Sequence, residues 1–192
     1  MSYYKLSNVI FIFVILMFFG ASIHVTAEEP MKSSSTNRVE IGESYTLERH
    51  DDWNIQCVKS PETQIDPCQL YQMLYDQKSN AVAEIHLFII LNNNEIAAGA
   101  SLMTPLETLL PRNIQLYIDT NPGKEYPFTF CTTLGCVSRI AFTEAEIDKL
   151  KQGNFVKAII YSARNPEVEI TATLSLKGFT AALKKLYLIA NN

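Results

Sequence analysis

The segment Val168-Glu169-Ile170-Thr171-Ala172-Thr173-Leu174-Ser175-Leu176 alternates between apolar and polar side chains. Successive side chains of a β-strand point to opposite faces, so this period of two predicts a strand with one buried face and one wetter face. Sheets that bury a single face are mostly antiparallel. The segment therefore predicts an antiparallel sheet.

The same period of two recurs along much of the chain. It is clearest in residues 53–57, 81–91 and 114–119, and further candidate strands are residues 69–77, 97–103, 127–131, 136–142 and 155–162. Turn-forming pairs such as Pro122-Gly123 and Asn165-Pro166 separate these segments. Many short strands separated by turns are typical of sandwiches and barrels. We predict a mainly β protein, an antiparallel β-sandwich or barrel-like domain with one short helix and a C-terminal helix.

Two segments have apolar residues at helical spacing and do not show the alternation of a strand. Thr143 to Gln152 begins with the Thr143-x-x-Glu146 spacing of a capping box, and Gly153 is placed to adopt the left-handed conformation after the last turn. Near the C-terminus the apolar residues that share one helix face are Phe179, Ala182, Leu183, Leu186 and Ala190. We expect this amphipathic helix to pack on an edge or end of the sheet; the alternative is a helix that binds a membrane surface or a partner.

The N-terminal residues have the layout of a secretory signal peptide. One charge, Lys5, precedes the unbroken apolar run 9–19, and Val25-Thr26-Ala27 offers a cleavage site before Glu28. This run is shorter than the about 20 residues that a transmembrane helix needs. We predict a cleaved signal peptide at residues 1–27, a flexible polar leader at 28–42, and a single disulfide-bonded β domain at 43–192 with no stable membrane span. The alternative is an uncleaved anchor over residues 9–27.

Composition narrows the classes of function. Of the 192 residues, 47% are hydrophobic, which is enough for a substantial core. The chain has 16 Lys and Arg and 20 Asp and Glu, which gives a net charge of −4. A nucleic-acid-binding protein normally has a basic face, so we expect no nucleic-acid partner. The sequence contains no glycine-rich loop of the kind that cradles phosphates, and we expect no cofactor.

Four cysteines follow the predicted signal peptide: Cys57, Cys68, Cys131 and Cys136. An even number of cysteines in an exported chain favours disulfides. Of the three ways to pair them, the spacing favours Cys57–Cys68 and Cys131–Cys136. A zinc site would need closely spaced cysteine pairs or added histidines, and only His50 and His86 follow the signal peptide, so we expect no metal.

Two groups of residues have the chemistry of a catalytic site. His50-Asp51-Asp52 joins a base to two carboxylates, but sequence neighbours point in different directions at a strand end, so a solvated turn is the simpler interpretation. Glu84 and His86 share the outer face of a predicted strand, where a solvent-facing pair is expected. Ser33-Ser34-Ser35 lacks the flanking glycines of a nucleophile elbow and is interpreted as linker. No complete catalytic constellation emerges, and we predict no enzyme.

Binding is better supported than catalysis. Tyr71, Met73 and Tyr75 share one face of a predicted strand, and aromatic residues with methionine are enriched at recognition surfaces. The alternative is that this face is buried and that Leu70, Gln72 and Leu74 face outward. A sugar or small-ligand pocket would need aromatics in a concave site; the single tryptophan, Trp53, shares a face with Cys57 and is expected in the core.

The order of several motifs resembles one family. The motifs are Asp52-Trp53-Asn54-Ile55-Gln56-Cys57, Pro67-Cys68, Ile114-Gln115-Leu116-Tyr117-Ile118-Asp119, Phe128-Thr129-Phe130-Cys131, Gly135-Cys136-Val137 and Ser175-Leu176-Lys177-Gly178-Phe179-Thr180-Ala181-Ala182-Leu183. Together they resemble the invasion-associated locus B proteins, apart from Pro111-Arg112-Asn113, where such proteins often have a glycine after the proline.

The resemblance implies an exported bacterial β-rich domain with two local disulfides, no known enzymatic chemistry, and a link to the invasion of host cells, including erythrocytes. Only the cysteines carry over as residues with a role, and that role is structural. We expect a location in the periplasm, on the outer surface or outside the cell, and an unknown host or envelope protein as partner. The alternative is a periplasmic envelope accessory protein with no direct host contact.

Overall fold

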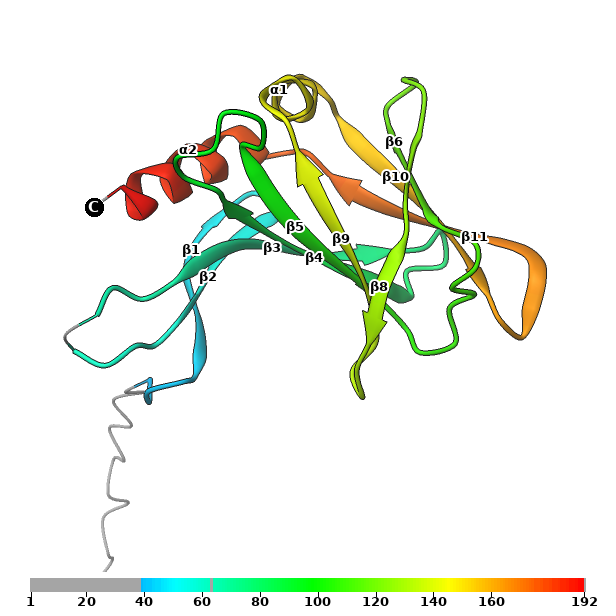
Figure 1. The fold of residues 1–192 in the computed structure, drawn as a ribbon, viewed down its shortest axis with the longest axis horizontal. Coiled ribbons are helices and arrows are strands. Elements are labelled where there is room, and N and C mark those ends of the chain that lie inside the picture. The colour runs from blue at the N-terminus through cyan, green and yellow to red at the C-terminus, as the bar shows by residue number, and fades with distance from the viewer. Residues whose placement is uncertain (1–38, 63, 192) are drawn as a thin grey trace, which may run out of the picture. The chain divides into compact units, whose positions relative to one another are not determined.

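The computed structural model describes residues 39–62 and 64–191 (Figure 1). In chain order the elements are β1 (Ser44–His50), β2 (Trp53–Val58), β3 (Cys68–Tyr75), β4 (Ala81–Ile89), β5 (Ala98–Thr104), β6 (Ile114–Ile118), β7 (Lys124–Tyr126), β8 (Phe128–Cys131), β9 (Cys136–Phe142), α1 (Glu144–Gln152), β10 (Phe155–Ser162), β11 (Asn165–Ser175) and α2 (Phe179–Ala190). The predicted signal peptide and most of the predicted leader lie outside the described residues. The end of that leader forms a turn, in which the Gly42 N–H donates to the Lys59 carbonyl at 2.8 Å.

One antiparallel sheet contains all of these strands, in the order β7-β6-β10-β11-β3-β4-β5-β9-β8, with β2 and then β1 added beside β3. Only Pro127 separates β7 from β8, so the chain itself joins the two ends of the order. The Ser138 hydroxyl donates to the Pro127 carbonyl at 2.9 Å and holds this corner against β9. The sheet is therefore nearly closed and barrel-like, which confirms the mainly β, antiparallel prediction.

The sheet forks at β3. The first half of β3 pairs with β2, whereas Tyr75 at its end pairs with Thr173 of β11. Gln72 lies at the fork, 6% exposed, and its side-chain amide donates to the Ser175 carbonyl at 3.0 Å and accepts from the Ser175 N–H at 2.7 Å. The Trp53 indole donates to the same carbonyl at 2.9 Å. A side chain thus supplies the hydrogen bonds that a neighbouring strand would make, and the buried amide is satisfied.

Helix α1 begins with the capping box that the sequence predicts, because the Thr143 side chain accepts from the Glu146 N–H and the Glu146 carboxylate accepts from the Thr143 N–H. The expectation for Gly153 was wrong, since this residue is extended, with φ −78° and ψ 168°. Its small size matters instead: a Cβ there would lie 2.8 Å from Leu176 Cδ1.

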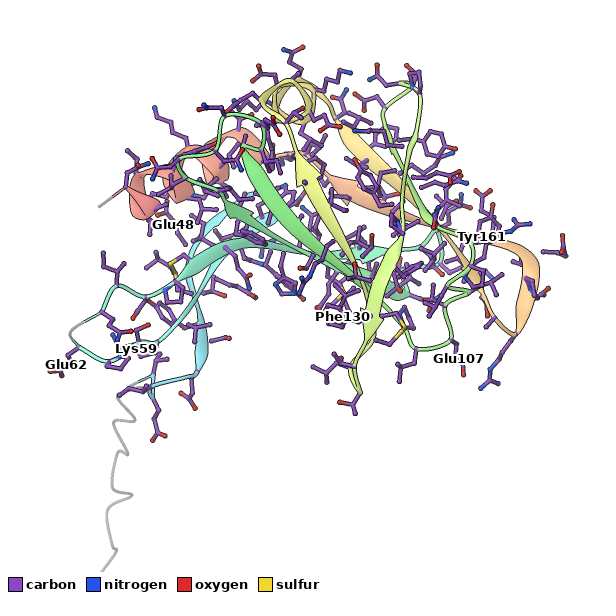
Figure 2. The ribbon with its side chains drawn as sticks, viewed as in Figure 1. Glu48, Lys59, Glu62, Glu107, Phe130 and Tyr161 are labelled. Carbon is purple, nitrogen blue, oxygen red and sulfur yellow. A yellow bond between two sulfur atoms is a disulfide. The ribbon has the colours of Figure 1, made fainter. Side chains whose placement is uncertain are left out.

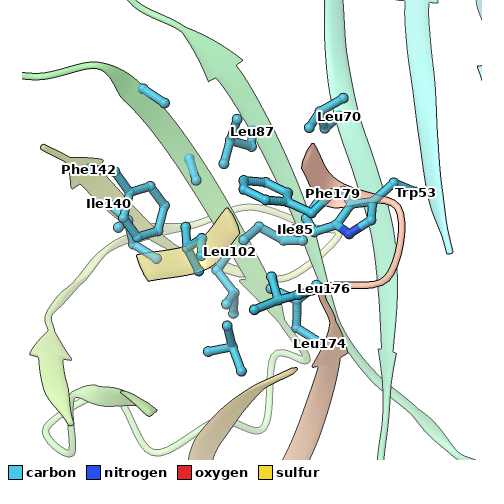
Figure 3. Close-up of a cluster of buried hydrophobic side chains, with 14 of the residues drawn as sticks. Trp53, Leu70, Ile85, Leu87, Leu102, Ile140, Phe142, Leu174, Leu176 and Phe179 are labelled. Carbon is cyan, nitrogen blue, oxygen red and sulfur yellow. The ribbon is translucent and has the colours of Figure 1, made fainter. Parts of the chain in front are cut away.

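Helix α2 packs against β1 to β4 and buries Phe179, Ala182, Leu183 and Leu186, four of the five residues predicted for its apolar face. The fifth, Ala190, is exposed, because it lies at the end of the helix. Gly178 precedes it with φ +84°, and a Cβ there would lie 2.2 Å from the His50 carbonyl oxygen, so the β1–β2 turn and the start of α2 require a glycine. The Phe179 ring centroid lies 5.2 Å from that of Trp53 (Figure 3). These contacts join α2 to the core inside the barrel.

The far end of β11 departs from its sequence pattern. Ala172 and Leu174 are buried as the alternation predicts, but Val168 is 48% exposed. Pairing with β3 is confined to Thr173, so the β10–β11 hairpin extends beyond the rest of the sheet (Figure 1). Alternation places Val168 and Leu174 on one face, but burial also requires another element to cover that face.

Disulfides join neighbouring strands at two places in the sheet, visible as yellow bonds in Figure 2. Cys57–Cys68 links β2 to β3, and Cys131–Cys136 links β8 to β9; the Cα atoms are 4.0 Å apart in both. This is the pairing that the spacing favours. Each disulfide closes a local hairpin, so the two act independently on different parts of the sheet.

Candidate functional site

Strand β3 presents its aromatic face outward. Leu70, Gln72 and Leu74 are buried, whereas Tyr75 is 49% exposed and Tyr71 and Met73 are partly exposed. The alternative that Leu70, Gln72 and Leu74 face solvent is therefore wrong. The sequence could not decide this, because both faces of β3 carry large apolar side chains.

Antiparallel pairing extends this outward face across four more strands. Directly paired residues share a face. One row runs Tyr71, His86, Ser101, Arg139, and the next runs Met73, Glu84, Met103, Val137, Phe130. We call the following side chains the outer patch: Tyr71, Met73, Tyr75, Glu84, His86, Phe88, Ser101, Met103, Phe130 and Arg139. The patch unites two separate candidates from the sequence, the Tyr71-Met73-Tyr75 face and the Glu84–His86 pair.

A polar network orders one side of the outer patch. The Tyr71 hydroxyl donates to Glu84 Oε2 at 3.1 Å, and the Tyr71 and His86 ring centroids are 5.1 Å apart. Gln69 Nε2 lies 2.9 Å from His86 Nδ1, and His86 Nε2 lies 3.4 Å from Glu84 Oε1. With the Gln69 amide nitrogen donating, Nδ1 is the acceptor and Nε2 carries the proton that faces Glu84. Burial raises the pKa of Tyr71, and the Glu84 charge raises it further. The network fixes the direction of these side chains.

The other side of the outer patch combines two aromatic rings with a guanidinium group. The Phe88 ring lies on Gly99, where a Cβ would be 2.5 Å from Phe88 Cζ. Beside this ring is a shallow hollow, lined by Phe88, Gly99, Ser101 and Arg139. Arg139 Cζ lies 5.2 Å from the ring centroid of Phe130, which Figure 2 shows on β8. Phe88 and Phe130 are each more than 40% exposed, so large apolar surface faces solvent here.

Five residues of the outer patch were not predicted from the sequence as binding residues: Phe88, Ser101, Met103, Phe130 and Arg139. Alternation in residues 97–103 places Ser101 and Met103 on the same face of one strand. Alternation in residues 136–142 places Arg139 on the polar face of a second strand. Only the strand order places these faces beside Tyr71 and Met73. Tertiary pairing is therefore the missing information.

The His50-Asp51-Asp52 trio does not converge on a common point. His50 Nε2 lies 3.0 Å from Glu48 Oε1, Asp51 Oδ1 lies 3.2 Å from Lys177 Nζ, and Asp52 Oδ2 accepts from the Ser175 hydroxyl at 2.7 Å. Each side chain thus serves a separate contact around the β1–β2 turn. Ser33 to Ser35 lie outside the described residues.

Trp53 is 1% exposed and belongs to the core, as the sequence predicts. Within residues 39–62 and 64–191, no group of three or more His, Cys, Asp or Glu side chains is placed to hold a metal ion. In the same part of the chain, neither helix is long and apolar enough to cross a membrane.

Comparison with known proteins identifies the family. The profile described as "Invasion associated locus B (IalB) protein" matches residues 53–187. Among solved structures, the chain is similar to a crystal structure of invasion associated protein B from Bartonella henselae, with a TM-score of 0.60 and 19% sequence identity over 75% of this chain and 96% of that chain. At this identity the structural likeness shows a shared fold. A search of curated proteins gave no match. Because the family profile covers most of its length, the chain belongs to the invasion associated locus B family.

Proposed function

We propose that this protein is an exported, non-enzymatic invasion-associated protein that supports bacterial invasion of host cells, including erythrocytes, by binding another protein through the outer patch. The observation that carries the proposal is that Tyr71, Met73 and Tyr75 face outward. They lie on the same face of the sheet as Phe88, Phe130 and Arg139. Membership of the family and its described link to invasion give the biological setting.

The composition of the outer patch supports a protein as the partner. Aromatic side chains, methionine and arginine are enriched at protein interfaces, and the few residues that dominate binding energy are often tyrosine or arginine. Tyr75, Phe88 and Phe130 supply exposed apolar area, and Glu84 and Arg139 supply one charge of each sign. A partner with matching apolar and charged groups would bury all five.

Export is part of the proposal. Disulfides persist in oxidising compartments, and the two in this sheet support a location in the periplasm, on the outer surface or outside the cell. We propose that residues 1–27 are removed as a signal peptide and that residues 28–42 link this cut to a single domain at 43–192.

The test compares exposed aromatic residues on and off the outer patch. Tyr75→Ala, Phe88→Ala and Phe130→Ala are combined in one variant, and Phe155→Ala with Leu188→Ala is the control, because these two side chains are 43% and 58% exposed elsewhere. Bacteria expressing the patch variant should invade cultured host cells as poorly as a deletion strain, while the control strain should match the wild type. Equal invasion by patch variant and wild type would refute the proposal.

Protease added to intact bacteria distinguishes the alternative of a periplasmic accessory protein. A host-binding protein should be digested on the surface or found in the medium. Complete protection in the periplasm, together with an invasion defect of the deletion strain, would support the accessory role and contradict direct host contact.

A further inference from the structure

An apolar cavity of about 180 Å³ lies inside the barrel. Its deep wall comes from five strands, through Leu74, Leu102, Leu116, Ala158 and Leu174. Protein interiors are close-packed and contain few voids larger than a water molecule. An apolar cavity of about 150 Å³ in another protein stays dry and binds benzene. The space in this barrel is therefore large enough for one aromatic ring or a short alkyl chain.

The cavity reaches the protein surface between α1 and the β6–β7 hairpin. Lys124 and Tyr126 line this mouth on one side, and Glu146 and Lys149 line it on the other. Glu146 forms an ion pair with Lys124 and accepts from the Thr143 N–H at 2.9 Å. Burial raises the pKa of Glu146, but the bonds from Lys124 and Thr143 outweigh it and leave the pKa lowered. The charge of Lys124 thus balances that of the Glu146 carboxylate, and Lys149 gives the mouth a net positive charge.

We propose that the barrel binds a small amphipathic carboxylic acid, with its apolar body in the cavity and its carboxylate at the mouth beside Lys124 and Lys149. The deep wall offers no side-chain hydrogen-bond partner, so burying a sugar or nucleotide there would leave its polar groups unpaired. Drug-sized ligands occupy pockets of about 300 Å³ or more, and the long acyl chain of a membrane lipid exceeds this cavity. Tyr126 is half-buried at the mouth, near the charges of Lys124 and Glu146, and its hydroxyl is the proposed donor to the carboxylate of the ligand.

This ligand site is separate from the outer patch. Leu74 and Leu102 face the cavity, whereas their chain neighbours Met73 and Met103 belong to the outer patch on the opposite face of the sheet. A variant that loses binding of the acid can therefore still be tested for binding of a protein partner, and the reverse.

Trp53 gives a direct signal for this site, because it is the only tryptophan of the chain and it lines the cavity. Protein purified after expression of the full chain is titrated with 3-phenylpropionate, with its neutral amide, and with straight-chain acids from butyrate to palmitate. We expect a saturable change in tryptophan fluorescence. The affinity for straight-chain acids should rise with chain length and fall once the chain is too long for the cavity. The amide should bind about fivefold more weakly than 3-phenylpropionate.

Variants locate the binding. Ala158→Leu should fill the cavity and weaken 3-phenylpropionate at least tenfold, and Leu116→Phe gives a second filled cavity if the first variant fails to fold by circular dichroism. Lys149→Gln should remove most of the difference between acid and amide, while Tyr75→Ala on the outer patch should bind like the wild type. The proposal is overturned if no acid gives a saturable signal, if folded filled variants bind normally, or if acid and amide bind equally.

Discussion

The inner and outer faces of β3, β4, β5 and β9 are built from the same strands, yet they have opposite chemistry. The inner row Leu70, Leu87, Ala100 and Ile140 is at most 3% exposed, and the outer row contains Tyr71, His86, Ser101 and Arg139. The inner rows hold the barrel and α2 together, whereas the outer rows expose aromatic and charged groups. The buried inner face therefore determines most of the stability, and the side chains of the outer face are less constrained by packing.

The largest expected effect is on the inner face at Trp53. Trp53→Ala removes the contact with Phe179 and the hydrogen bond to Ser175, and should lower the free energy of unfolding by about 3–5 kcal/mol. Tyr75→Ala on the outer patch should change it by less than about 0.5 kcal/mol. Urea unfolding followed by circular dichroism measures both. Similar losses at the two positions would contradict the division between the faces.

The disulfides should come next. Replacing both Cys57 and Cys68 by serine should cost about 3 kcal/mol, and replacing Cys131 and Cys136 about 2 kcal/mol, because the first pair closes the longer loop. The order tests whether the β2–β3 disulfide contributes more to the free energy of unfolding than the β8–β9 disulfide. Urea unfolding of the two double variants gives the answer, and the reverse order would show that loop length does not set the relative stabilisation by the two disulfides.

Gln72 is one of the buried polar residues on the inner face. Gln72→Ala leaves the Ser175 N–H without its partner and should cost about 2 kcal/mol, whereas Gln69→Ala, on the opposite face of the same strand, should cost less than about 1 kcal/mol. Hydrogen exchange adds a local readout, since the Ser175 amide should exchange faster in the Gln72 variant alone. Unchanged exchange at Ser175 would contradict the role of Gln72 at the fork.

The smallest effect concerns pH and the outer patch. Burial and Glu84 raise the pKa of Tyr71 above its ordinary value of 10.0, so the folded state holds this proton more tightly than the unfolded state. The associated stability is complete below about pH 10 and is lost as the pH rises through the folded pKa. Tyr71→Phe should make the fall of unfolding free energy above pH 10 shallower than in the wild type, and Glu84→Gln should have part of this effect. Identical slopes in urea titrations from pH 9 to 11 would contradict the assignment.

The sequence predicted the elements with strong local signals. Alternation gave β9 and β10 with their bounds as observed, and helical spacing gave the buried face of α2. Strand β1 was not predicted, because its exposed and half-buried residues show no apolar period and a bulge between Thr46 and Glu48 interrupts its pairing. It is a strand because β2 pairs with it, which is a long-range property.

The sites were predictable to different degrees. Tyr71, Met73 and Tyr75 could be grouped from the sequence but not assigned to a face, and the cavity mouth at Lys124 and Lys149 gave no signal at all. Lys124 and Glu146 belong to a strand and a helix that are separated along the chain, and only barrel closure brings them together. A polar constellation assembled from distant elements leaves no pattern in any short segment.

Local patterns in the sequence were enough to predict which residues share a face, most of the strands, both helices, and which cysteines lie close enough along the chain to pair. These properties follow from local backbone geometry, which repeats every two residues in a strand and every 3.6 in a helix. Only the tertiary structure decided which face of β3 is inside, that Gln72 bridges the fork, and that the barrel closes at Pro127 around a cavity. Burial and pairing depend on elements far away in the chain, and no local period records their positions.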